Sequence, residues 1–182
     1  KKINPKSRLY NPDLGGGAIL DVGCYPVSFS SLIANLDQSN LDNPEIVDVS
    51  GSICETGVDE IAYSTLIFKK KFTAKIGAAI RLNMKNQTLI IGSKGNILIN
   101  SPWLPQEKSF VEIKSEQRYY KSYINCKLNI YANQINFANK CILDGKKQAD
   151  FPAMTWKDTI NNMFILDNWK KKLFTIENEK NN

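Results

Sequence analysis

Residues 72–82 alternate strictly between two sets of side chains, and this period of two constrains the fold most. The even-numbered positions, from Phe72 to Leu82, are all apolar, whereas the odd-numbered positions, from Thr73 to Arg81, are polar or small. Alternation of this kind puts each set on one face of a β-strand. The segment therefore predicts a strand with one buried face, which needs a second layer packed against that face.

Five other runs predict further strands, because they are rich in β-branched residues or are bounded by turn residues. They are residues 46–53, 61–68, 87–91, 96–100 and 110–114. The links between several successive strands are short, which favours antiparallel pairing over parallel pairing.

A helical spacing of apolar residues appears toward each end of the chain. From Ala18 to about Leu36 the apolar positions recur at intervals of three and four, which predicts an amphipathic helix. Pro26 falls inside this helix and lacks a backbone N–H, so we expect a kink or break near residues 22–25.

Two more helices are predicted toward the C-terminal end, at residues 130–144 and 155–173. The second begins with Thr155 and Asp158, which have the spacing of a capping box. Residues 176–182 are predicted to form a frayed polar tail. The expected fold class is α+β, with an open, mostly antiparallel β-sheet and helices on one face.

Composition limits the classes of function. The chain has 182 residues, which suggests one domain over residues 1–182, and its net charge is +6. The lysines cluster at a predicted turn and at helix ends, Arg is sparse, and we expect no nucleic-acid binding. No apolar run approaches the roughly 20 residues that span a bilayer, so no membrane partner is expected.

The four cysteines lack the paired spacing of a metal site, and the chain has no His, so no metal is expected. Cysteines of this kind are most often reduced thiols in a cytoplasmic protein, which is the location we expect.

The stretch from Leu14 to Pro26 carries the best candidates for chemistry. Three glycines run into an apolar segment in which Asp21 and Tyr25 lie four residues apart, on one face if the segment is helical. An acid beside a phenol suits gripping a polar substrate and moving a proton. In the alternative interpretation, Asp21 solvates the first helical turn and Tyr25 is half-buried core.

Residues 8–26 resemble the start of the C-terminal domain of the glucose–fructose oxidoreductase, inositol dehydrogenase and rhizopine-catabolism (Gfo/Idh/MocA) family. The similarity is greatest to its dihydrodiol and xylose dehydrogenase branch, and residues 90–99 and 151–169 also resemble segments of that domain. Many members have His where this chain has Tyr25, so the branch that uses Tyr fits.

The resemblance implies an NAD- or NADP-dependent dehydrogenase acting on a sugar, polyol or related secondary alcohol. It implies that Tyr25 transfers the proton and that Asp21 orients the substrate. Arg8 is a further candidate for substrate contact, although it is also explained as a surface charge or a partner of Asp13. Gly16 and Gly17 are candidates for contact with the cofactor, because glycine permits close approach to a ligand.

Two motifs of the family's N-terminal half are missing from the sequence: the Gly-x-Gly-x-x-Gly fingerprint and the Glu-Lys-Pro motif with its active-site lysine. The chain is therefore predicted to be the C-terminal substrate-binding and oligomerisation domain, with the N-terminal dinucleotide-binding domain absent from it. Alone, it is expected to be inactive.

A non-catalytic module is the alternative function. The strand at residues 61–68 is apolar on both faces, so one face can pack on helices while the other needs a second cover. A second copy of the chain is the expected cover, giving a homo-oligomer through the open sheet face.

Overall fold

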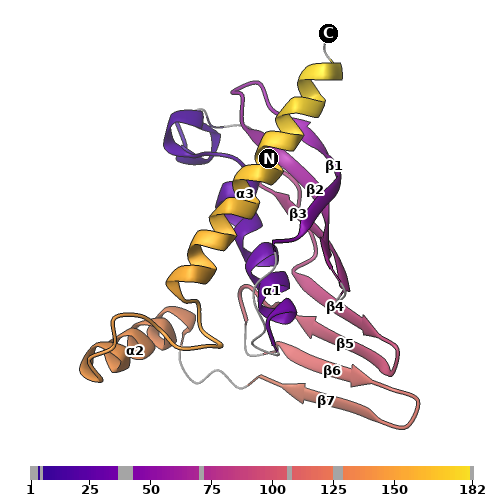
Figure 1. The fold of residues 1–182 in the computed structure, drawn as a ribbon, viewed down its shortest axis with the longest axis vertical. Coiled ribbons are helices and arrows are strands. Elements are labelled where there is room, and N and C mark those ends of the chain that lie inside the picture. The colour runs from indigo at the N-terminus through magenta and orange to yellow at the C-terminus, as the bar shows by residue number, and fades with distance from the viewer. Residues whose placement is uncertain are drawn as a thin grey trace. The chain divides into compact units, whose positions relative to one another are not determined.

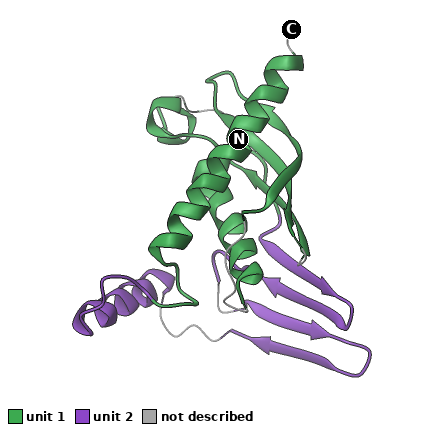
Figure 2. Ribbon diagram, in the orientation of Figure 1, with its two compact units in different colours: residues 1–84, 150–182 green, residues 85–149 purple. Residues whose placement is uncertain are grey.

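The computed structural model describes residues 4, 6–36, 43–69, 72–105, 108–124 and 129–180. Residues 37–42, which precede the first predicted strand, residues 70 and 71 of the predicted lysine turn, and Cys126 lie outside them. The chain forms two compact units, residues 1–84 with 150–182, and residues 85–149 (Figure 2).

The α+β class and the antiparallel pairing of the strands are confirmed, but the strands form two open sheets where one was expected. The first sheet ends because residues 80–86 make bends and extended chain, without strand pairing. The alternation of the preceding strand continues through Met84 and first breaks at Asn86, so the sequence pattern does not mark the end of the strand.

The first unit contains a three-stranded antiparallel meander (Figure 1). Its strands are β1 (Glu45–Ile53), β2 (Asp59–Phe68) and β3 (Phe72–Ala79). The alternation predicted for β3 is confirmed, because Ile76 and Ala78 are buried while Thr73 and Lys75 are exposed.

The helical elements of this unit are two 3₁₀ turns, η1 (Arg8–Tyr10) and η2 (Pro12–Leu14), a π-helical turn η3 (Ile19–Gly23), and the helices α1 (Cys24–Ala34) and α3 (Trp156–Lys180). Both α-helices contribute to one core against the sheet face that carries Ala62, Leu66 and Ala78, as expected for helices on one face. Trp169 lies at its centre, with no exposed surface, and donates its indole N–H to the Tyr63 carbonyl over 3.3 Å.

The capping box predicted for α3 is confirmed. The Thr155 hydroxyl accepts the Asp158 N–H at 3.2 Å, and the Asp158 carboxylate accepts the Thr155 N–H at 2.9 Å. The predicted C-terminal limit is wrong, because the helix continues from Leu173 to Lys180. Leu173 and Glu179 in this stretch are strong helix formers, and an ion pair of 2.6 Å links Lys180 to Glu177 within it.

The second unit contains a four-stranded antiparallel meander and one helix. These are β4 (Gln87–Gly92), β5 (Gly95–Asn100), β6 (Phe110–Lys114), β7 (Tyr119–Tyr123) and α2 (Ile130–Leu143). The sequence did not predict β7. Asn129 caps the start of α2, and Gly145, with a φ of 68°, follows its end.

One helical stretch, Pro12–Ala34, is long and apolar enough by length and composition to cross a membrane, with a mean hydropathy of 1.4 in its most apolar window. This corrects the expectation that no run approaches that length. Ala18, Ile19 and Val27 within it belong to the core of the first unit, and a core helix passes the same test.

Replacement of Trp169 by Ala is expected to lower the free energy of unfolding by about 3–5 kcal/mol, because it empties the centre of the core and removes the bond to the Tyr63 carbonyl. Trp156→Ala is the matched control on the same helix. Its indole is 59% exposed, so the loss should be about 1 kcal/mol or less. Urea unfolding of both variants checks this, and equal losses would contradict the packing described here.

Candidate functional site

The glycine-rich stretch folds back on the segment that precedes it. The N–H groups of Gly16 and Gly17 donate to the carbonyls of Asn11 and Leu9, each over 2.9 Å. A Cβ at Gly16 would lie 2.7 Å from both carbonyl oxygens, so no larger residue fits without a shift. Both glycines are buried by the chain's own atoms. A contact of Gly16 or Gly17 with a cofactor stays a prediction, and in this arrangement it would act through the shape of the loop.

Asp59, the first residue of β2, accepts a hydrogen bond from the start of the helical run that follows the glycines. Its carboxylate has no exposed surface and accepts the Ile19 N–H over 2.7 Å. Gly17 has a φ of 112°, and a Cβ there would overlap Asp59 Oδ1. The last glycine of the triplet therefore makes room for a carboxylate that lies 40 residues beyond Ile19 in the chain.

Sequence reasoning missed Asp59. The signal was the pair of acids Asp59 and Glu60 next to the predicted strand, but that strand was predicted to begin at Ile61, which left both acids outside it. An acid inside a strand whose neighbours are apolar needs a polar partner within the core, and that requirement was available from the sequence.

The helical run changes register between Ile19 and Cys24. Residues 19–23 form a π-helical turn, and α1 begins at Cys24, close to the predicted break at residues 22–25. Pro26 cannot donate to the carbonyl four residues earlier, which accounts for a break at this place. π-turns inside helices are rare and are frequent at functional sites.

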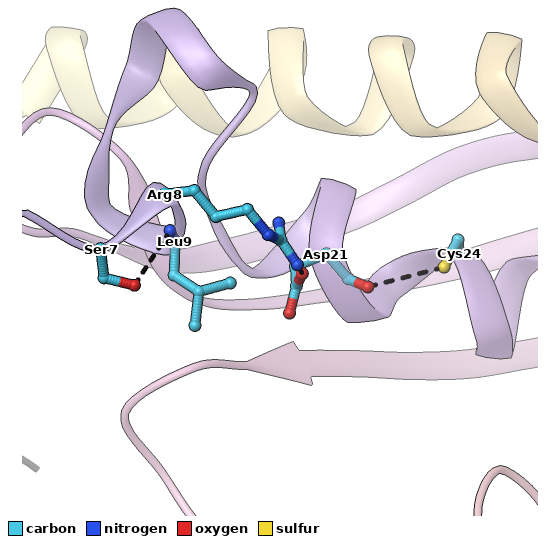
Figure 3. A network of polar contacts seen from close by, with 5 residues as sticks. All are labelled: Ser7, Arg8, Leu9, Asp21 and Cys24. Atoms are coloured by element: carbon cyan, nitrogen blue, oxygen red, sulfur yellow. Dashed lines mark hydrogen bonds and ion pairs between the residues drawn. The ribbon is translucent and has the colours of Figure 1, made fainter.

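Asp21 lies on the π-turn and forms an ion pair with Arg8 (Figure 3). Arg8 Nη2 donates to Asp21 Oδ1 over 2.6 Å, and the two side chains are 63% and 19% exposed. Of the alternatives for Arg8, the partner is Asp21 rather than Asp13. The structure thus brings together two of the predicted substrate contacts, and the guanidinium still presents N–H groups to solvent.

Tyr25 is the second residue of α1 and its side chain is 46% exposed. Tyr25 belongs to neither of the hydrophobic cores found among the described residues, and its catalytic role stays a prediction. Next to it, the Cys24 thiol donates to the Asp21 carbonyl over 3.7 Å (Figure 3). Burial raises the pKa of the Cys24 thiol above its ordinary range.

These residues can bind a polar, hydroxylated molecule and exchange a proton with it. The Arg8–Asp21 pair offers donors and acceptors side by side, and Tyr25 offers a phenol within the same short stretch. Among the residues that the structure describes, no three His, Cys, Asp or Glu side chains gather as a metal site would need.

No protein-family model matches the chain. Proteins named trans-1,2-dihydrobenzene-1,2-diol dehydrogenase are similar to it. The Xenopus tropicalis protein is 30% identical over 167 residues, and the Xenopus laevis protein is 31% identical over 166 residues. Each alignment covers 88% of this chain and 48% of the relative, so the chain spans about half the length of the curated relatives it matches.

Solved structures share the fold. The 3-ketoreductase KijD10 of Actinomadura kijaniata, in complex with NADP and TDP-benzene, matches with a TM-score of 0.70 and 21% identity, over 90% of this chain and 48% of its own. The dehydrogenase MviM of Clostridium difficile matches with a TM-score of 0.63 and 14% identity, over 85% of this chain and 48% of its own.

The pKa of the Asp59 carboxyl is raised, chiefly because burial disfavours its charged form, and the Ile19 N–H offsets this only in part. An acid whose pKa is higher in the folded state holds its proton more tightly when folded. Its stabilising contribution is therefore complete below the unfolded pKa of about 3.9 and is lost as pH rises through the folded pKa.

We therefore expect the free energy of unfolding of the wild-type chain, minus that of Asp59→Asn, to fall as pH rises from about 4 toward 7. Asn carries no charge at any pH, so the difference isolates the titration of Asp59. Urea unfolding of both proteins across this range provides the measurement. A difference that is constant or rises with pH would show that burial does not dominate at Asp59.

Proposed function

We propose that the chain forms the substrate side of an NAD- or NADP-dependent dehydrogenase, because the comparisons support a C-terminal domain of the Gfo/Idh/MocA oxidoreductase family. The substrate class is a sugar, a polyol or a related secondary alcohol. The observation that carries the proposal is the Arg8–Asp21 ion pair on the π-turn that precedes the exposed Tyr25.

The ion pair is suited to holding a hydroxyl next to the one that reacts. Asp21 is largely shielded and can accept from a substrate O–H, while the more exposed Arg8 can donate to a neighbouring oxygen. Each group also neutralises the charge of the other, so the pair suits an uncharged, hydroxylated molecule. The relatives are named for a 1,2-diol, which has two such hydroxyls side by side.

Tyr25 is proposed to exchange the proton of the reacting hydroxyl. In the direction of oxidation, Tyr25 Oη, as the phenolate that has lost its own proton, takes the proton from the alcohol oxygen as the carbon–oxygen bond becomes a carbonyl. The oxidised nicotinamide, when bound, supplies the acceptor for the hydride that leaves the same carbon. A phenol has an ordinary pKa of about 10, so efficient proton transfer near neutral pH needs a cation beside it.

That cation is expected from outside the described site. Arg8 is engaged by Asp21, and the chain lacks the Glu-Lys-Pro motif whose lysine serves this role in the family. The residues present fit the substrate side of the reaction. They fit a dinucleotide site less well, because Gly16 and Gly17 face the chain's own carbonyls and Asp59.

The comparisons give no support to a non-catalytic module. The cytoplasmic location and the absence of nucleic-acid, membrane and metal partners stay predictions. So does assembly through the sheet face opposite the helices, on which Tyr63 of β2 is 39% exposed.

Tyr25→Phe tests the proton-transfer role in the full-length protein, assayed with trans-1,2-dihydrobenzene-1,2-diol or D-xylose and NADP⁺. The variant keeps the ring and deletes the hydroxyl, so kcat should fall by roughly 10²- to 10⁴-fold with a nearly unchanged melting temperature. Tyr131→Phe, on the exposed face of α2, is the matched control and should keep wild-type turnover. Retention of more than about a third of the turnover by Tyr25→Phe would reject the assignment.

Asp21→Asn should act on binding more than on turnover. The amide keeps the size of the side chain but loses the charge that holds Arg8, so KM for the diol or sugar should rise more than kcat falls. Steady-state kinetics of this variant separate the two effects. A fall in kcat at constant KM would contradict the binding role.

The chain of residues 1–182 by itself is expected to bind neither NAD⁺ nor NADP⁺ tightly and to show no dehydrogenase activity, since it has no dinucleotide fingerprint. Calorimetric titration with each cofactor provides the measurement. Micromolar binding would mean that this chain holds the cofactor itself.

The chain is also expected to self-associate through the outer face of β2. Tyr63→Asp places a charge on this face, so sedimentation at high micromolar concentration should change from a dimer or larger species to a monomer. Leu36→Asp, at an exposed position after α1, is the control that should leave assembly intact. A monomeric wild-type chain would count against assembly.

A further inference from the structure

The buried carboxylate of Asp59 has no part in the chemistry proposed above, although it lies next to the segment that carries it. It forms none of the ion pairs found among the described residues, and its Oδ1 atom is buried without a hydrogen-bond partner. Such a group costs stability, since burial disfavours a charge with incomplete pairing. The geometry around Asp59 indicates what this side chain does in return for its cost in stability.

Asp59 replaces a cap that the local sequence does not supply. The helical run begins after Ala18, whose methyl group cannot accept a hydrogen bond, and no side chain near the π-turn caps it. The first backbone N–H groups of a helix need acceptors from elsewhere. Asp59 Oδ2 supplies one for Ile19, at 2.7 Å, from the neighbouring sheet. A negative charge at this end of a helical run is also favoured by the helix dipole.

The π-turn is fixed at both of its ends. Ile19, its first residue, is bonded to Asp59, and Gly23, its last, packs so closely on Trp169 that a Cβ there would lie 3.0 Å from the indole. Asp21 lies between these two points, and Tyr25 follows two residues after Gly23. If the first fixed point were lost, the turn would be free to change register, and Asp21 would turn relative to Tyr25.

We infer that Asp59 is a positioning residue, whose buried carboxylate holds the Ile19 amide and thereby fixes the π-turn that orients Asp21 relative to Tyr25. The inference rests on the function proposed above. It assigns no contact between Asp59 and the substrate. Gly17 contributes to the same arrangement, because only a residue without a side chain leaves room for the Asp59 carboxylate.

The test uses the full-length protein with two readouts, hydrogen exchange of residues 18–26 and steady-state kinetics with trans-1,2-dihydrobenzene-1,2-diol and NADP⁺. Asp59→Ala removes the acceptor, so exchange in this segment should become faster by about tenfold or more. Misplacement of the site should lower kcat by roughly ten- to a hundredfold, with the affinity for NADP⁺ unchanged. Exchange of the α3 amides near Trp169 should not change.

Two further variants keep the inference testable if Asp59→Ala folds poorly. Asp59→Asn retains an oxygen that can accept the Ile19 N–H, so it should restore most of the exchange protection and of kcat. Gly17→Ala should imitate Asp59→Ala, because its methyl group would displace the carboxylate. Gly15→Ala controls for backbone strain: Gly15 also has a positive φ, of 67°, but a Cβ there meets nothing closer than 3.9 Å.

Glu60→Gln is the control for a change of charge at the neighbouring position. Glu60 pairs with Arg81 over 2.6 Å, and its loss should leave exchange in residues 18–26 and kcat unchanged. Unchanged exchange in Asp59→Ala would overturn the inference. Faster exchange in Asp59→Ala with a normal kcat would also overturn the inference, provided that Tyr25→Phe lowers kcat as expected in the same assay. If Tyr25→Phe retains turnover, the proposed function itself fails, and the catalytic part of this inference fails with it.

Discussion

The hydrogen bond from the Ile19 amide to the buried carboxylate of Asp59 joins the helical layer of the first unit to its sheet at the place where the candidate site lies. This hydrogen bond restricts which residues can occupy the glycine stretch before Ile19 and the start of β2. Gly17 must lack a side chain, and β2 must begin with an acid although that position is fully buried. Burial raises the pKa of that acid, because the charged form is disfavoured away from water. The position of Asp21, two residues further along, depends on it.

Local patterns in the sequence predicted the elements whose cause is local. The alternation in β3 follows from the burial of one sheet face, and the capping box of Thr155 and Asp158 forms because its partners are three residues apart. The break before α1 follows from the missing N–H of Pro26. Tyr25 and Asp21 were placed on one helical segment correctly, since their spacing is fixed by the chain itself.

Features that depend on partners distant in sequence were not predicted. The bond to Asp59 spans 40 residues, and no local pattern shows which amide a buried acid will meet. The strand β7 was not predicted, because Tyr119–Tyr123 has no apolar alternation. It forms a strand through its pairing with β6. Arg8 had two acids within reach in the sequence, and only the folding back of the glycine stretch brings Asp21 to it. The division into two sheets likewise depends on tertiary pairing.

The central claim is that Tyr25 and the Arg8–Asp21 pair bind the reacting alcohol. A crystal structure of the full-length protein with NADP⁺ and an unreactive polyol analogue tests it most directly. The account predicts Tyr25 Oη within about 3.2 Å of the oxygen at the reacting carbon, with the neighbouring hydroxyl on Asp21 or Arg8. A polyol bound elsewhere, with Tyr25 Oη beyond hydrogen-bonding reach of any of its oxygens, would contradict the account.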